Sequence, residues 1–421
     1  MGANPSSDMS SGRAHIARGT MGFVQTGMKC RCRGAQERKR GKGLLYVLPD
    51  YYPDFHCVAG ECEDTCCAGW QIVIDEKSLK KYRGCRGAFR SRMRQSVNWK
   101  EKIFCQDKEK RCAFLNEKNL CDLYTGMGAE SLCRTCRLYP RHIEEYENVR
   151  EVSLSVSCPE AARLLLNRQE PMRFLEFWRD REESYEEFDE LLYSELTDCR
   201  KDMFAILQNR SLPLRLRCGL ITGLANDVQK RFNEGKLFTC RELAERMGER
   251  QTVTVTEQKM KRRAGKNYPW ISWMFRFLYT MEYLKEDWKI WLEEAEERLY
   301  SRGEEPYLGI EQEFLDWMEH DSRDWQIPFE QLLIYFLSVY FCGAVYDGEI
   351  LAAAQLGVVH VWLVREMLMA VWLRNGKVLN MEDMQDMVCR YSRELEHSDV
   401  NQKAMERKMR YSRLPWLQKD R

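Results

Sequence analysis

Cysteine is concentrated in one part of this 421-residue chain, in a pattern that favours metal chemistry. The stretch FHCVAGECEDTCCAGW, from Phe55 to Trp70, places four thiols between positions 57 and 67. Thirteen of the eighteen cysteines lie at or before Cys158. A buried structural cysteine behaves as a small apolar residue and has no reason to cluster. Disulfides or a bound metal must therefore account for the pattern.

The compartment decides between these two explanations. Residues 1–43 contain no apolar segment of the kind that a secretory signal needs, so we expect a cytoplasmic protein. Disulfides are rare in a reducing cytoplasm, and clustered thiols there point to metal. The net charge of +1 gives no reason to expect nucleic acid or an anionic membrane as a partner.

Nine cysteines form the candidate ligand set, and they occur in compact blocks: Cys57, Cys62, Cys66, Cys67, Cys112, Cys121, Cys133, Cys136 and Cys158. Cys66 and Cys67 are adjacent, so their side chains should diverge. Nine thiols exceed the four that a tetrahedral zinc site or a four-iron cluster uses, which leaves one site with spare thiols or two sites. The all-thiolate set and the absence of Cys/His zinc-finger spacing favour iron–sulfur, with structural zinc as the alternative. His56 and His142 lie near these blocks but are more often ordinary surface or core residues.

Composition divides the chain into three parts. Residues 1–43 carry nine Lys/Arg against two acids and predict a disordered basic tail. Residues 44–166 form the Cys-rich domain, with short strands expected at 69–75 and, most clearly, at Val149 to Ser157. Proline after Cys158 predicts a helix start that places this thiol at a helix N-terminus, where the dipole favours thiolate.

Residues 167–421 predict a large helical domain, so the fold class is mainly α with a few short strands. Expected helices include 174–192, 270–299 and 329–346, and the alternation of TVTVT at 252–256 marks one strand candidate. The longest largely apolar run, 332–346, is shorter than a membrane-spanning helix needs, and the next is interrupted by Arg365 and Glu366. Both segments are expected to be buried helices rather than membrane spans.

Four blocks in this order resemble the bacterial flagellin lysine-N-methylases, which belong to a wider group of Cys-rich iron- or zinc-chelating proteins. The blocks are FHCVAGECEDTCCAGWQIVID, CAFLNEKNLCDLY, ESLCRTCRLYPR and EVSLSVSCPEAARLLL. The C-terminal half is similar more loosely, through YFLSVYFCGAVYDGE and YSRELEHSDVN, and the likeness extends roughly over 46–401. Matched thiol by thiol, the resemblance covers the nine candidate ligands and leaves Cys85, Cys105 and the two tail cysteines as spare.

The resemblance implies methyl transfer from S-adenosylmethionine to lysine side chains of flagellin by an enzyme that holds an iron–sulfur cluster, with 4Fe–4S as the expected type. The alternative is a metal-binding or electron-transfer protein with no methyl transfer. The chain has no glycine-rich turn after a first strand and no Cys-x3-Cys-x2-Cys triplet, so its motifs do not locate the donor site. Since the unusual chemistry lies among the thiols, we expect the donor next to the cluster.

Three further groups of residues are candidates for binding or catalysis. Arg137, Tyr139 and Arg141 could bind the donor's carboxylate, although an exposed basic turn explains them about as well. Near the C-terminus a base or a lysine-binding acid could come from Tyr391, Glu394, Glu396 and His397, where a charged helix end is the simpler reading. An aromatic surround for an ammonium group could come from Trp70, Tyr82 and Tyr124, which are more often core residues.

Overall fold

The computed structural model describes residues 43–180, 188–237 and 240–418. The predicted basic tail, except Gly43, lies outside the described residues. Within them, sixteen α-helices and six short strands confirm a mainly α fold.

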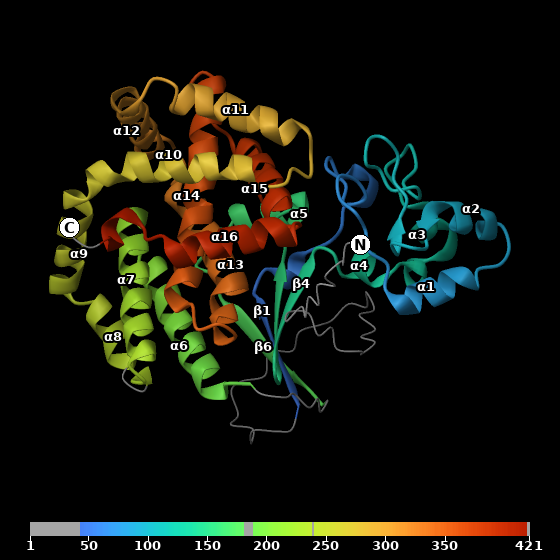
Figure 1. Cartoon of the computed structure of the whole chain (residues 1–421), viewed down its shortest axis with the longest axis horizontal. Helices are drawn as coiled ribbons and strands as arrows, with labels where there is room; N and C mark the ends of the chain where they lie inside the picture. The colour runs from blue at the N-terminus through green and yellow to red at the C-terminus, as the bar shows by residue number, and fades with distance from the viewer. Residues whose placement is uncertain (1–42, 181–187, 238–239, 419–421) are drawn as a thin grey trace, which may run out of the picture. The chain divides into compact units, whose positions relative to one another are not determined.

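One mixed sheet of four strands stands beside the helices (Figure 1). Its strands, in the order β4-β5-β1-β6, are Arg141–Tyr146, Val149–Leu154, Leu44–Pro49 and Phe174–Arg179. β1 pairs in parallel with β5 and antiparallel with β6, while β4 and β5 form a hairpin. The predicted strand at 149–157 is confirmed over 149–154, with Val152 and Leu154 buried.

The Cys-rich segment has a small core of its own. Ile72, Leu79, Phe104, Phe114 and Leu123 form it together with Cys112 and Cys133. The surrounding elements are α1 Glu76–Arg83, α2 Phe89–Ser96, β2 Val97–Asn98, β3 Ile103–Phe104, α3 Asp122–Met127 and α4 Arg134–Leu138. The predicted boundary at 166/167 does not follow this division, because β6 lies beyond it and Tyr51, Leu154 and Val156 join the core of the helical part.

α14, Ile350–Arg374, is the central helix of that larger core and packs against α7, α13, α15 and α16 (Figure 1). α13 and α14 belong to the two segments long and apolar enough to cross a membrane, yet both are mostly buried among other elements, as core helices are. The helices of this part are α5 Pro159–Leu166, α6 Glu190–Leu207, α7 Leu214–Asn233, α8 Arg241–Met247, α9 Arg250–Arg262, α10 Asn267–Phe277, α11 Asp287–Leu299, α12 Glu304–His320, α13 Gln326–Tyr340, α15 Met381–Glu396 and α16 Asp399–Tyr411.

Two predicted elements are wrong because tertiary packing overrides local pattern. The helix expected at 174–192 begins with β6, which pairs along its whole length with β1, and α6 starts only after its N-cap, Asp189. The strand expected at 252–256 lies inside α9. Val253, Thr256 and Met260 recur at helical spacing, and the last two lie close to Gly219 of α7. Packing against α7 therefore favours a helix here, although alternating β-branched residues by themselves favour a strand.

Two other expected elements are present in altered form. The stretch 69–75 forms only isolated bridges rather than a strand, although its alternation holds, with Ile72 and Ile74 buried and Val73 exposed. The helix expected at 270–299 is two helices, α10 and α11, separated by a turn and a loop. The helix at 329–346 begins at Gln326 and ends in a 3-10 turn at 341–345.

The predicted helix start after Cys158 is confirmed, since α5 begins at Pro159 with Cys158 as its N-cap. The expected stabilisation of the Cys158 thiolate at this helix N-terminus is not confirmed. Burial raises the pKa of Cys158 to about 11 and outweighs the backbone N–H groups of Ala161 and Glu160, which lower it.

A fully buried carboxylate joins two helices of the larger core and the loop before one of them. Glu330 of α13 lies 2.5 Å from the guanidinium of Arg217 on α7 and 2.9 Å from that of Arg210 in the preceding loop. Removing one partner from a buried ion pair leaves the others charged and without compensation.

Replacing Glu330 with Ala should therefore lower the free energy of unfolding by about 3–5 kcal/mol. Urea denaturation followed by circular dichroism measures this loss. The matched control is Glu313→Ala, which breaks an exposed pair with Lys377 and should cost less than about 1 kcal/mol. Equal losses in the two variants would contradict a special role for the buried cluster.

Candidate functional site

The nine candidate thiols are free cysteines, and the structure separates them into two sets. The "loop set" comprises Cys57, Cys62, Cys66 and Cys158. The "core set" comprises Cys67, Cys112, Cys121, Cys133 and Cys136, all of which belong to or pack on the small core. The adjacent Cys66 and Cys67 fall into different sets, but their side chains do not diverge as expected, because a hydrogen bond joins them.

The Arg393 guanidinium joins two of the segments that carry the loop set. Arg393 of α15 donates to the carbonyl of Asp64 at 2.6 Å and to that of Ser157 at 3.0 Å. It also forms an ion pair with the Asp64 carboxylate. Since Asp64 lies between Cys62 and Cys66, and Ser157 precedes Cys158, this contact places Cys158 beside the Cys-rich loop despite their separation in sequence.

Backbone pairing brings the core set together. The Cys112 N–H donates to the carbonyl of Cys67 at 2.8 Å, and an isolated bridge joins Leu115 with Cys121. Cys133 and Cys136 lie on consecutive turns at the start of α4, and the Cys133 sulfur is 3.8 Å from the carbonyl of Val73.

The effects of the thiols on one another's pKa values largely follow the same division into two sets. In the loop set, a hydrogen bond to Cys67 and then burial raise the pKa of Cys66, and Cys57 and Cys158 raise it further. In the core set, burial raises the pKa of Cys112 to about 12, with contributions from Cys67, Cys121 and Cys133. The Cys66–Cys67 hydrogen bond is the link between the sets, and it lowers the pKa of Cys67 to about 7.

No three His, Cys, Asp or Glu side chains among the described residues are close enough to hold a single ion. A mononuclear zinc site requires four ligands within about 2.0–2.3 Å of one point. The predicted metal module is therefore not established by the arrangement of side chains. Within each set the thiols lie near one another but do not converge on one point. A four-iron cluster is larger than one zinc ion, so the four thiolates that hold it lie farther apart than zinc ligands do.

The C-terminal end of α15 packs directly on the loop set. The His397 ring packs in a tilted arrangement on Trp70 and Tyr139, with ring centroids 4.7 and 5.8 Å away. Its Nε2 lies 2.7 Å from the Ser157 hydroxyl. Burial, with help from the charge on Arg393, lowers the pKa of His397 to about 4. The imidazole is thus neutral at pH 7 and a weak base.

The two acidic candidates on α15 are engaged in holding the fold. Glu394 accepts the backbone N–H groups of Leu284 and Lys285 at 2.7 and 2.8 Å, which fixes the loop before α11. Glu396 accepts from the hydroxyls of Tyr340 and Tyr335 at 2.8 and 3.1 Å, and from Ser392. Burial raises the pKa of both carboxyls. Tyr391, the fourth candidate, bonds His360 at 2.7 Å in the core.

The three residues expected to bind the donor have separate partners. Arg137 is 4.0 Å from Glu130, Arg141 donates to the Tyr52 hydroxyl at 2.9 Å, and Tyr139 is packed beneath His397. The proposed aromatic surround is likewise dispersed. Tyr82 packs on Phe104 in the small core, and Tyr124 is exposed.

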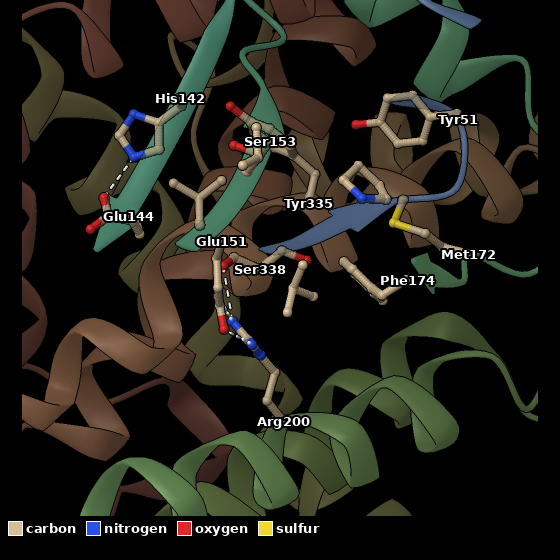
Figure 2. A pocket seen from close by; sticks show the side chains of 14 residues that line it. Tyr51, His142, Glu144, Glu151, Ser153, Met172, Phe174, Arg200, Tyr335 and Ser338 are labelled. Carbon is tan, nitrogen blue, oxygen red and sulfur yellow. Dashed lines mark hydrogen bonds and ion pairs between the residues drawn. The ribbon is translucent and has the colours of Figure 1, made fainter. Parts of the chain in front are cut away.

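A small cavity lies between the sheet and α13 (Figure 2). Its volume of about 30 Å³ has room for about one water molecule. His142 and Glu144 form a hydrogen bond of 2.6 Å on one side, and Arg200 pairs with Glu151 at 2.5 Å on another. This cavity is too small for an adenosyl donor, so it is no candidate for the donor site.

Comparison with known proteins places the chain in a family. The sequence profile of the FliB lysine N-methylase C-terminal domain matches residues 200–415. The chain belongs to the FliB lysine N-methylase family. The matched segment contains α15 and most of the larger core but none of the nine candidate thiols.

Three relatives agree with this family. The flagellar biosynthetic protein FliU of Salmonella muenchen is 32% identical over 140 residues, which cover 31% of this chain and 82% of that protein. Lysine-N-methylases of Salmonella choleraesuis and Salmonella typhimurium are each 31% identical over 144 residues, 32% of this chain. The match spans only 36% of the length of these two methylases. No solved structure matches the chain.

The residues that join the FliB-family segment to the thiols were missed by sequence reasoning. Arg393, Ser157 and Asp64 carry no motif, and their contact depends on chain segments more than 90 residues apart. The only available signal was position, since each lies next to a candidate residue.

Replacing Arg393 with Gln should loosen the loop of residues 62–67, because hydrogen bonds from a charged group contribute about 1.5–3 kcal/mol each. Amide hydrogen exchange at these residues should become at least roughly tenfold faster. Arg390→Gln is the matched control, since Arg390 lies on the same helix but pairs with Asp287. Unchanged exchange in the Arg393 variant would show that the loop is held by other contacts.

Proposed function

We propose that this protein transfers methyl groups from S-adenosylmethionine to lysine side chains of flagellin in the cytoplasm. The carrying observation is its membership of the FliB lysine N-methylase family, supported by the flagellar name of one relative. The identity of the donor and of the protein substrate are parts of this proposal.

The reaction is a direct displacement. The neutral lysine nitrogen attacks the methyl carbon, the carbon–sulfur bond breaks, and S-adenosylhomocysteine leaves with the bonding electron pair. The lysine must first lose a proton, because an ammonium group has no free electron pair. Glu394 and Glu396 accept hydrogen bonds from the fold and His397 is a weak base, so these three residues have positioning roles and the proton passes to water.

Testing this function requires anaerobically purified protein, purified flagellin and donor labelled in the methyl group. Label should appear on flagellin lysines, as located by mass spectrometry. Flagellin with acetylated lysines is the control and should stay unlabelled. No label on untreated flagellin under these conditions would refute the proposed function.

The rate of methyl transfer should rise with pH between about 7 and 9, approaching tenfold per unit, because the neutral fraction of a lysine of pKa about 10.4 rises in this way. The burial that lowers the pKa of His397 to about 4 keeps this residue neutral throughout the range. Initial rates at saturating donor and flagellin measure the profile. A rate independent of pH would argue against deprotonation of lysine before the chemical step.

The cysteine sets fit an iron–sulfur cluster by the chemistry of their donors, which are all thiols. We propose that the loop set, with four thiols, and the core set, with five, are separate metal sites. A bound cluster would supply a rigid anchor for the loop and a centre capable of electron transfer. Arg393, Trp70 and Ser157 position the loop set for it from the protein side.

Replacing Cys158 with Ser should remove about half of the bound iron and sulfide, since only one of two sites loses a ligand. Chemical analysis of iron and sulfide per chain, with the visible absorbance, measures this. Cys85→Ser, at a cysteine outside both sets, is the control and should keep the full content. Loss of all iron in the Cys158 variant would instead indicate a single site with spare thiols, and a colourless protein with zinc would refute the cluster.

A further inference from the structure

A second and much larger cavity lies in the helical part, away from every residue considered as a site so far. Its volume is about 750 Å³, within the range of small-molecule and cofactor sites. It is formed by the start of α7, the end of α12, the loop after it, the start of α13 and the middle of α14. All its lining residues except Trp416 fall inside the FliB-family segment, 200–415.

One wall of the cavity is apolar and aromatic. Trp362 is half-buried at the centre of a stack, with Trp270 at 5.4 Å on one side and Trp416 at 5.8 Å on the other. Leu315 and Val361 extend this wall. A flat heteroaromatic ring can pack against such a surface, while its edges keep access to polar groups.

Charged side chains line the cavity beside this apolar wall, and some of them have no partner. Arg365 is paired with Glu311 at 3.0 Å. Arg215, in the first turn of α7, is exposed to solvent, and its side chain has no hydrogen-bond or ion-pair partner among the described residues. Although the residue is exposed overall, the atoms around its guanidinium lower the pKa of Arg215, the nearby Glu311 carboxylate raises it and Arg365 lowers it.

Acidic groups line the same cavity on the segment beside the start of α7, where the Leu214 N–H donates to the Gln326 side chain at 2.8 Å. Glu319 has no partner among the described residues, and Asp321 and Asp324 use one oxygen each to accept the backbone N–H groups of Arg323 and Gln326. The cavity thus offers the guanidinium groups of Arg215 and Arg323 for an anion, acids for a cation and an apolar wall for a ring.

We infer that this cavity binds the methyl donor as an adenosyl amino acid: the carboxylate of its methionine part on Arg215, its purine on the wall around Trp362, and its cationic centres toward the acids. A guanidinium binds a carboxylate with two parallel hydrogen bonds, and the field at the N-terminus of α7 adds to the attraction. The acids also attract the ammonium of an incoming lysine. The inference rests on the proposed function and replaces the expected donor site around Arg137, Tyr139 and Arg141.

The test compares two ligands that share the purine and ribose but differ in the amino-acid part. S-adenosylhomocysteine carries the carboxylate, and 5′-methylthioadenosine lacks it. In calorimetry, Arg215→Gln should weaken binding of the first by roughly ten- to a hundredfold, and leave binding of the second within about threefold, as expected for loss of one charged hydrogen-bonded pair. Leu315→Trp, which fills the cavity, should weaken both.

The control is Arg298→Gln on α11, whose arginine pairs with Glu294 on the same helix and does not line the cavity. It should leave both affinities unchanged. Undiminished binding of S-adenosylhomocysteine in the Arg215 variant, together with normal methylation of flagellin, would overturn the donor site and leave the proposed function standing.

Two further results would overturn the inference. An equal loss of both ligands in the Arg215 variant would contradict the carboxylate contact. If the wild-type protein bound adenosine triphosphate but not S-adenosylhomocysteine, the cavity would be a nucleotide site. That result would also contradict S-adenosylmethionine as the donor in the proposed function.

Discussion

The Arg393 guanidinium is the interaction on which the arrangement of the rest depends. It joins α15 of the larger core to Asp64 in the Cys-rich loop and to Ser157 at the end of the strand that leads to Cys158. Burying such a charge is costly unless each hydrogen-bonding group is satisfied, so the contact has little tolerance for a different geometry. This contact fixes the Cys-rich loop, which has few apolar residues, on the surface of the larger core.

Buried carboxylates have the same role elsewhere in the larger core. Glu330 neutralises Arg210 and Arg217, while Glu366 accepts hydrogen bonds from Tyr300 and Tyr307 at 2.8 and 3.0 Å and lies beside Arg365. Burial raises the pKa of Glu366 to about 7, in spite of Arg365, which lowers it. The acidic residues that sequence reasoning selected as catalytic candidates accept hydrogen bonds that hold the fold together. Unsatisfied charge is therefore the better guide to a binding site. Among the charged side chains that line the large cavity, those of Arg215, Glu319 and Arg323 have no hydrogen-bond or ion-pair partner among the described residues.

Local rules predicted the elements that depend on local physics. Proline after Cys158 fixed the start of α5, and the alternation around Val152 gave β5 its buried face. They failed at β6, where pairing with β1 overrides the sequence from 174 on, and at α9, where contact with Gly219 selects a helix. The nine thiols could be chosen from their clustering, but their division into two sets could not. That division depends on where residue 393 lies relative to residues 64 and 157, which no spacing encodes.

The separation of the thiols from the large cavity bears on what a cluster would do. Direct displacement at a methyl group exchanges no electrons between protein and donor, so the chemistry itself has no need of a redox centre. The loop set is tied to α15, and α15 packs on α14, whose Val361, Trp362 and Arg365 line the cavity. A change at the thiols can therefore reach the cavity through these two packed helices, and also through α5, which follows Cys158 and packs on α13. If the donor binds in the large cavity as inferred above, the Cys-rich domain sets the position of the helices that line this cavity. The reacting groups then lie in the helical part.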